Sequence, residues 1–418
     1  MRYRSFDMRK CLTIKMIATL AAFFLLCLTM PQQAVAQTGD DAVAALVDLG
    51  FENVSCTEET DERIYVLQNS AYRVQGKGIS KAVDVIQKMG LPSQKPCRII
   101  VLDNNVPQIS LTYQPIIGDS VPEARHSDWE VSYELDAAWK KARKTKRHNS
   151  SLFKVDIVVY PELSLQNLII TQVYQVLFNL NPTIEVSLWR GAKFTGQVII
   201  PIYNEYGSSY EQIRQGFITL SQEVRLPYNI FLTASVGTFN NERWGGALDA
   251  KYIFKDERFS LLGRIGYSGR SHFDNWRWKV SPLKRLTWSV GGSFFWPLYN
   301  TNFTLKAEQY LLGEKGVRFD MYRKFRYTTI GFYAMKVSDT ANSGFNGGFR
   351  FQVMLPPYGR YKRRGYIPRI TTSDYMGMVY NAGNERYYGK SFRPRVDDNI
   401  GKENSFNPYF IKSELLNF

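Results

Sequence analysis

Charged side chains recur at every second position in several long stretches of the second half of the chain. Lys306 and Glu308, for example, lie on one face of an extended strand, and Leu305 and Ala307 lie on the other. Such a polar face can bind hydroxyl and anionic groups, or it can form a ladder of cross-strand ion pairs that fills and rigidifies a barrel. Eight residues are assigned to it: Asp249, Lys251, Arg264, Lys306, Glu308, Arg318, Asp320 and Arg350.

The same residues give little support for catalysis. Glu308 and Asp320 could be assigned as the two carboxylates of a glycosidase, but acidic side chains are common inside barrels, and spacing alone does not establish such a pair. His272 is the one histidine in this region, which leaves little basis for a Ser-His-Asp site. We therefore expect no catalytic residue, no metal site and no cofactor.

The first 36 residues have the layout of a cleavable signal peptide. Basic residues at positions 2–15 precede an apolar stretch, Met16–Met30, and the sequence Ala34-Val35-Ala36 follows. A retained single helix is the alternative, but the apolar stretch is short for a membrane span. The protein is therefore expected to be exported.

Two cysteines remain after removal of that peptide, Cys56 and Cys97. An even pair in an exported chain indicates a disulfide, which would stabilise the fold by roughly 3–4 kcal/mol on the chain-entropy model. Two free thiols in a core are the alternative.

Two basic segments could bind polyanions such as lipopolysaccharide phosphates or acidic polysaccharide. They are WKKARKTKRH at 139–148 and RYKRRGYIPR at 360–369, in a chain with 53 Lys+Arg and 38 Asp+Glu. The alternative is that both are ordinary solvated surface segments. Nucleic acid is not expected as a partner of an exported protein. The candidate polyanion contacts are Lys140, Lys141, Arg143, Lys144, Arg363 and Arg364.

The chain divides into four parts by pattern: the signal peptide (1–36), a small α/β domain (37–115), a basic connector (116–163) and a β-rich region (164–418). In the small domain, helices are expected through Leu49 and over Ile79–Met89 because Gly50, Gly90 and Pro92 end them. Two β-prone stretches between the helices and two after the second helix give the order αββαββ.

The β-rich region predicts a transmembrane antiparallel β-barrel of about 12 strands. Its alternating runs are about 9–13 residues long, whereas soluble strands average about 5–6 and a tilted bilayer span needs about 9–11. Trp and Tyr cluster near the ends of these runs, as interface girdles require. After the signal peptide, no apolar run is long enough to indicate a polytopic helical membrane protein.

Several segments resemble the YjbH-like family of outer-membrane proteins of exopolysaccharide and capsule biosynthesis. They are Glu242–Tyr252 (ERWGGALDAKY), Phe303–Arg323 (FTLKAEQYLLGEKGVRFDMYR), Gly344–Pro356 (GFNGGFRFQVMLP) and, in the small domain, Glu62–Ile86 with Tyr72-Arg73. Members of that family are longer and have a second barrel-like half, whereas this chain has one.

The resemblance implies a non-catalytic role in the secretion or assembly of a surface polysaccharide, with the small domain in the periplasm. The expected partners are outer-membrane lipid and lipopolysaccharide, the polysaccharide itself, and other secretion proteins in the periplasm. The polar face would then hydrogen-bond sugar hydroxyls and pair with uronate or phosphate groups. The alternatives are a general small porin and a barrel enzyme that acts on lipid or glycan.

Overall fold

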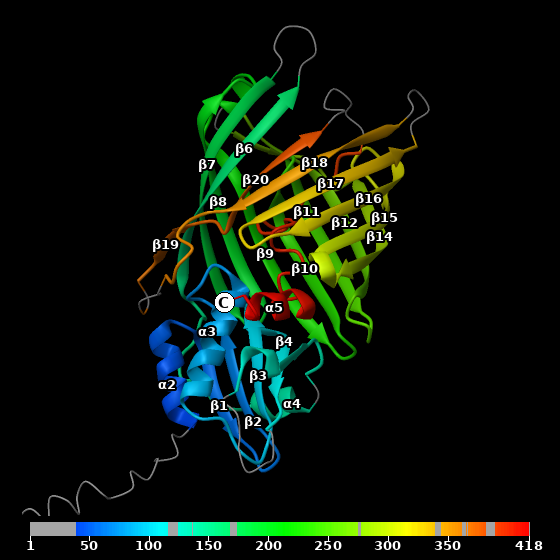
Figure 1. Ribbon diagram of the computed structural model, residues 1–418. Helices are drawn as coiled ribbons and strands as arrows, with labels where there is room; N and C mark the ends of the chain where they lie inside the picture. Colours follow the sequence, from blue (N-terminus) through cyan, green and yellow to red (C-terminus); the bar gives the residue numbers. More distant parts are fainter. Residues whose placement is uncertain are drawn as a thin grey trace, which may run out of the picture. The chain divides into compact units, whose positions relative to one another are not determined.

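A computed structural model describes residues 39–115, 124–135, 137–167, 174–274, 277–338, 344–361, 365, 367–381 and 389–417. The predicted signal peptide, Arg363 and Arg364 lie outside the described residues. The described residues are mostly β and form two sheets (Figure 1). None of the helices in these ranges is long and apolar enough to cross a membrane.

The small sheet has five strands in the order β1-β2-β3-β4-β5. The β2–β3 pair is parallel because α3 connects the two strands, and the other pairs are antiparallel. The strands are β1 (Glu52–Glu58), β2 (Arg63–Gln68), β3 (Cys97–Asp103), β4 (Val106–Tyr113) and β5 (Trp129–Ser132).

Helices cover both faces of the small sheet. On one face α2 (Gly39–Leu49), α3 (Gln75–Lys88) and α5 (Pro408–Leu415) pack in one core with inward residues of β2–β4. On the other face, Ala138 and Ala142 of α4 (Ala138–Ala142) pack on the intervening residues of β2 and β3. Because residues of both faces are buried, β2 and β3 contain consecutive apolar residues, at 64–67 and 99–102.

The expected αββαββ order is confirmed, with α3 beginning four residues earlier than the predicted helix at Ile79. The described residues of the segment 116–163, which was expected to be a connector, instead form regular structure. They are β5 of the small sheet, α4, which packs on that sheet, and the start of β6 in the large sheet.

The disulfide prediction is wrong, because Cys56 and Cys97 are free thiols. Cys56 lies on β1 opposite Tyr65, and Cys97 lies on β3, so β2 separates them. Two strand spacings are about 10 Å, beyond the roughly 7 Å limit for the Cα atoms of a disulfide.

The large sheet is an antiparallel meander of long strands. Strands follow one another in sequence order from β6 to β18, except that β13 (Arg277–Val280) pairs only with β12. The strands are β6 (Val155–Asn167), β7 (Tyr174–Trp189), β8 (Ala192–Asn204), β9 (Arg214–Leu226), β10 (Ile230–Phe239), β11 (Arg243–Ile253), β12 (Phe259–Asp274), β14 (Arg285–Trp296), β15 (Thr301–Gln309), β16 (Lys315–Lys324), β17 (Thr328–Val337) and β18 (Phe345–Met354).

One segment contacts both ends of this strand series. Its first part, β19 (Arg369–Thr372), pairs in parallel with β6, and its second part, β20 (Tyr375–Asn381), pairs antiparallel with β18. Between them, Ser373 N donates to Val159 O at 2.8 Å. The first and last long strands are thereby brought together, and Figure 1 shows the sheet curving round an interior.

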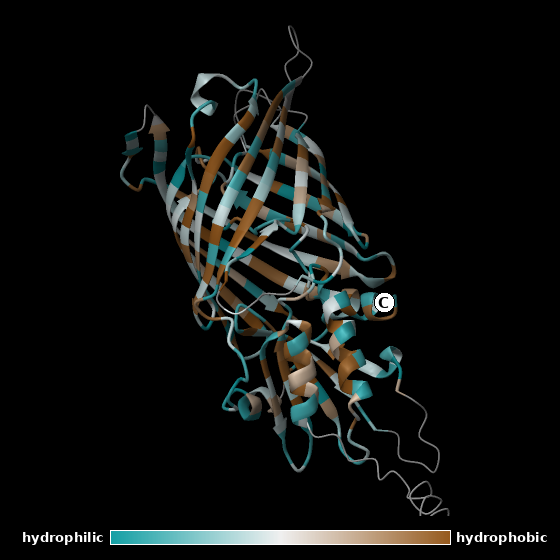
Figure 2. Ribbon diagram, turned by 90° about the vertical axis from the view of Figure 1, so that its left-hand side faces the viewer, coloured by the Kyte–Doolittle hydropathy of each residue, from teal (hydrophilic) through white to brown (hydrophobic). Residues whose placement is uncertain are grey.

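The alternation expected from the sequence is confirmed along the strands. Val290, Leu305 and Phe332 are 58%, 56% and 54% exposed, whereas their polar neighbours point to the other face. Figure 2 shows the result as alternating apolar and polar bands along the strands.

Candidate functional site on the inner face of the large sheet

The polar face of the large sheet is occupied by the chain's own C-terminal segment, which we define as residues 389–407. It forms hydrogen bonds, ion pairs or ring contacts with residues of the small sheet and with strands spread around the large sheet: β8, β10, β11, β12, β15, β16 and β18. A single extended segment can reach strands so widely separated only from within the curve of the sheet. The polar face is therefore the inner face.

The segment begins beside the β10–β11 turn. There Asn241 donates to the carbonyl of Ser391 at 2.6 Å, and the ring of Phe392 stacks on Phe239 at a centroid distance of 5.0 Å. Gly266 on β12 lets this ring approach closely, because a Cβ there would lie 2.7 Å from the Phe392 ring.

A group of four charged residues then holds the segment. Arg264 pairs with Asp249 on the neighbouring strand and, at 2.7 Å, with Asp398 of the C-terminal segment. Arg395 of the C-terminal segment also pairs with Asp249, at 2.8 Å. The two arginines and two aspartates balance in charge, and their guanidinium groups are suited to several carboxylate oxygens at once.

Further along, the segment contacts both the large and the small sheet. Lys251 donates to Asn404 at 2.7 Å, and Asn404 in turn donates to Asn302 and Tyr322 at 2.9 Å. Lys402 pairs with Asp103 of the small sheet at 3.1 Å. The segment thus runs through the interior from the β10–β11 turn to the small sheet.

A second charged group lies on β16–β18. Arg318 contacts Asp320 through two nitrogens at 2.7 and 2.9 Å, and Arg350 lies 3.7 Å from the same carboxylate. Both arginines lie over the ring of Tyr333, at 4.4 and 5.3 Å. Lys306 lies opposite Arg318 in the β15–β16 pair. The two-nitrogen pair lies within β16, and only the contact between Arg350 of β18 and Asp320 joins different strands.

Six of the eight residues assigned to one face are therefore divided between two arrangements, and Lys306 and Glu308 lie on β15 opposite Arg318 and Gly316 of β16. Three of them, Asp249, Lys251 and Arg264, contact the C-terminal segment, and Arg318, Asp320 and Arg350 contact one another.

Glu308 and Asp320, the two carboxylates of the glycosidase alternative, are not opposite each other. Glu308 lies opposite Gly316, four residues from Asp320 along β16, so their Cα atoms are about 14 Å apart. Asp320 instead accepts from Arg318 at 2.7 and 2.9 Å. His272 on β12 contacts Glu242 at 2.7 Å. Among the residues that the structure describes, no group of His, Cys, Asp and Glu is arranged to hold a metal ion.

The helix that follows the C-terminal segment, α5, belongs to the core of the small domain. Ile411 and Leu415 are fully buried there, and Asn407 caps the helix by accepting from Tyr409 N and Phe410 N. Glu414 accepts from Gly76 N on α3 at 2.9 Å. A Cβ at position 76 would lie 2.3 Å from that of Glu414, so this approach requires glycine. Burial raises the pKa of Glu414 to about 7.

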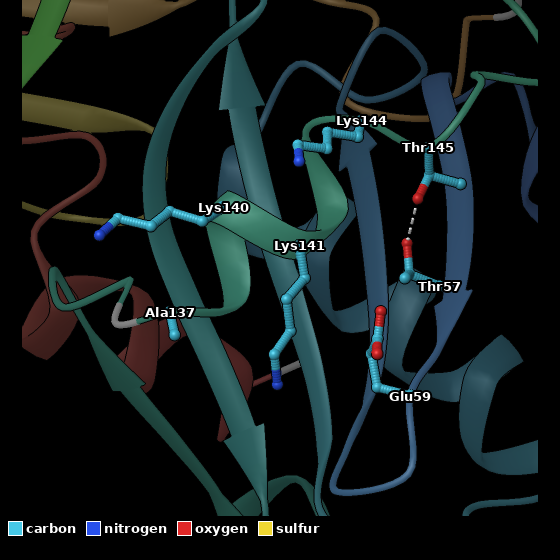
Figure 3. Close-up of a pocket in the computed structure, with 7 residues that line it drawn as sticks. All are labelled: Thr57, Glu59, Ala137, Lys140, Lys141, Lys144 and Thr145. Carbon is cyan, nitrogen blue, oxygen red and sulfur yellow. Dashed lines mark hydrogen bonds between the residues drawn. The ribbon is translucent and has the colours of Figure 1, made fainter.

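The basic residues of α4 and the turn after it surround an open depression of about 510 Å³ (Figure 3). Lys140, Lys141 and Lys144 line it, together with Thr57 and Thr145, whose hydroxyls lie 2.6 Å apart. Lys141 is neutralised by Asp61 at 2.6 Å and Glu62 at 3.2 Å. Among the described residues, Lys140 and Lys144 form no ion pair, and both are exposed.

Residues of the C-terminal segment that hold it in place, above all Arg395, Asp398 and Lys402, are not among the site residues predicted from the sequence. The predicted barrel extends over residues 164–418, whereas residues 389–407 form no strand and α5 packs in the small domain. The signal that could have found them is the loss of alternation after Asn381, where charged and amide residues follow one another from Arg393 to Asn404.

Comparison of the chain with protein-family models finds no matching family, and comparison with curated proteins finds no significant match.

Proposed function

We propose that this chain is an outer-membrane protein that takes part in the secretion or assembly of exopolysaccharide or capsule and does not catalyse a reaction. In this proposal the large sheet closes into a transmembrane barrel through the segment Arg369–Asn381, and the small domain lies in the periplasm. The outer face of the barrel contacts lipid and lipopolysaccharide, and other secretion proteins bind in the periplasm.

The exposed apolar outer face supports the membrane location. Large apolar side chains are exposed on many strands from β7 to β20, and such continuous apolar surface is unusual on a soluble monomer. The strands are also long enough for a tilted bilayer span, since β10, β11 and β14 have 10, 11 and 12 residues.

The C-terminal segment inside the sheet is the observation that most favours this proposal over a small porin. An open porin requires a water-filled interior, whereas this interior contains a segment that is paired with strands on several sides. The resemblance to the YjbH-like family supports the link to polysaccharide, and the exposed basic residues beside α4 are suited to an acidic polymer.

The test is to delete the gene and quantify cell-surface polysaccharide by composition analysis. Loss of the polymer or its retention inside the cell, restored equally by the wild type and by Glu308→Gln, would support a non-catalytic secretion role. Unchanged polysaccharide would contradict the role, and failure of Glu308→Gln alone would indicate a barrel enzyme. A steady ion conductance of the purified full chain in planar bilayers, with unchanged polysaccharide, would indicate a porin.

A further inference from the structure

Three arginines gather around Trp139 on the surface of the small domain; we call Arg143, Arg147 and Arg190 the arginine cluster. The guanidinium carbons of Arg147 and Arg190 lie 5.8 and 5.0 Å from the centroid of the Trp139 ring. Arg143 and Arg147 follow α4, whereas Arg190 comes from the turn between β7 and β8. The cluster is therefore assembled from the small domain and the large sheet.

Contacts between the two sheets fix the position of Arg190. Gly191 N donates to the carbonyl of Asn104, in the β3–β4 turn, at 2.9 Å, and Ser187 donates to the Asn104 side chain at 2.8 Å. Trp139 packs against the apolar core under α4, and Arg147 donates to Ser55 on β1. The arginine cluster is thus built on anchored backbone rather than on a free loop.

The arginine cluster has no acidic partner within the described part of the chain. No carboxylate there forms an ion pair with its three members, in contrast to Lys141, which has two acidic partners. Burial and the charge of Arg190 lower the pKa of Arg147 to about 10, and burial and the charge of Arg143 lower the pKa of Arg190. Like charges held together and partly removed from water are relieved by a bound anion.

Further basic residues, Lys140 and Lys144, lie on the other side of α4. Ala138 and Ala142 form its buried face, so Trp139 and Arg143 lie to one side, and Lys140 and Lys144 lie to the other, where they line the open depression (Figure 3). A single small anion would engage one side of the helix only. A polymer with repeated negative charges could pair with both sides at once, which raises its affinity through multivalency.

We propose that the arginine cluster binds a carboxylate or phosphate group of an acidic polysaccharide, and that Lys140 and Lys144 pair with further acidic groups of the same chain. This inference rests on the proposed function and narrows it, because it makes the polymer acidic rather than neutral. Guanidinium groups suit this role because they donate two parallel hydrogen bonds to a carboxylate or phosphate.

The test is isothermal titration of the purified full chain in detergent with oligogalacturonate, a model polyuronate. Neutral dextran, inorganic phosphate and lipopolysaccharide are titrated in parallel. We expect oligogalacturonate to bind with an affinity that falls as salt rises, and dextran not to bind. The double variant Arg147→Gln/Arg190→Gln should weaken oligogalacturonate binding by roughly tenfold or more, as expected for the loss of charge-assisted hydrogen bonds.

Arg323→Gln is the matched control. Arg323 is also an exposed arginine on aromatic rings, 5.2 Å from Tyr299 and 4.9 Å from Phe325, but it lies outside the arginine cluster. Its removal should leave oligogalacturonate affinity unchanged. The variant Lys140→Gln/Lys144→Gln should weaken binding by a smaller factor, roughly threefold, because ammonium groups pair with single oxygens.

Several outcomes would overturn the inference. They are unchanged affinity in Arg147→Gln/Arg190→Gln, equal binding of dextran, or binding of lipopolysaccharide or inorganic phosphate without binding of oligogalacturonate. If oligogalacturonate does not bind but the deletion strain has a polysaccharide defect, the proposed function stands and the polymer is neutral. Oligogalacturonate binding with normal surface polysaccharide would instead refute the proposed function.

Discussion

The two sheets of this chain point their apolar side chains in opposite directions. In the small sheet, Ile64, Leu67 and Ile99 are fully buried, and helices cover both faces. In the large sheet, Val290 and Leu305 are more than half exposed, and the polar side chains face the interior. The small sheet thus has the polarity of a protein in water, and the large sheet has the polarity expected in an apolar surrounding.

The comparison also shows how one chain connects the two sheets. The C-terminal segment uses ion pairs and amide contacts within the large sheet, and then α5 uses Ile411 and Leu415 in the core of the small domain. The C-terminal segment is therefore held in the large sheet by polar contacts that are specific in direction, whereas α5 is held mainly by the burial of apolar side chains, which is not directional.

The largest effect is expected from a charge on the outer face of the large sheet. Leu305→Arg places a cation in the middle of β15, where a bilayer midplane position costs about 2–4 kcal/mol, so assembly into liposomes should fail. Leu298→Arg is the matched control, because Leu298 is 72% exposed in the turn before β15 and should cost at most about 1 kcal/mol. Heat-modifiability on gels measures assembly, and equal behaviour of both variants would contradict a membrane surface on the outer face.

The next effect concerns the attachment of α5 to the small domain and depends on pH. Because the pKa of Glu414 is raised to about 7 in the folded protein, the protonated carboxyl is favoured there. Its contribution is complete below the ordinary value near 4.5 and is lost as pH rises through 7, by about 3 kcal/mol at about 1.4 kcal/mol per pKa unit.

Hydrogen exchange of α5 at pH 5.5 and pH 8 measures this change. Protection should fall with pH beyond the intrinsic increase in exchange rate, and Glu414→Gln should remove the dependence, because the amide oxygen can still accept from Gly76 N. Protection that does not change with pH, once the intrinsic exchange rate is taken into account, would show that the pKa of Glu414 is not raised.

A smaller effect should separate the two charged groups on the inner face. Arg264→Gln leaves Asp249 and Asp398 to share Arg395, so the C-terminal segment should lose about 2 kcal/mol of attachment and be cleaved faster in limited proteolysis. In Arg318→Gln, Asp320 retains Arg350. This second charged group does not hold the C-terminal segment, so the cleavage rate of the segment should stay the same as in the wild type. Equal cleavage in the two variants would contradict the distinction between the groups.

Most of the fold follows from local patterns. Period-two alternation predicts the strands around Leu305 and Val290 because a strand with one apolar and one polar face has to repeat every two residues. Apolar residues at helical spacing predict α2 and α3 in the same way. The approximate length of the strands and the division into a polar and an apolar face could therefore be derived without contacts between distant residues.

The parts that could not be predicted depend on contacts between residues far apart in sequence. Asp398 gives no local sign that it will meet Arg264, 134 positions away, and Arg190 stands alone in a turn until the fold brings it to Trp139. Alternation predicts a polar inner face, but it does not predict that the C-terminal segment occupies the interior of the large sheet. Periodicity reports which face a residue lies on, but not which segment covers that face.

The smallest effect, no change at all, is expected when the small sheet is exposed to a reductant. Because β2 separates Cys56 from Cys97, no covalent bond joins β1 to β3. Burial also raises the pKa of the Cys56 thiol to about 11, so little thiolate is present at neutral pH.

The Tm of the small domain should be the same with and without dithiothreitol. Cys97→Ala should lower its stability by about 1 kcal/mol, because a fully buried side chain is lost. A fall in Tm with dithiothreitol would show that β1 and β3 are cross-linked and that the strand order of the small sheet is different.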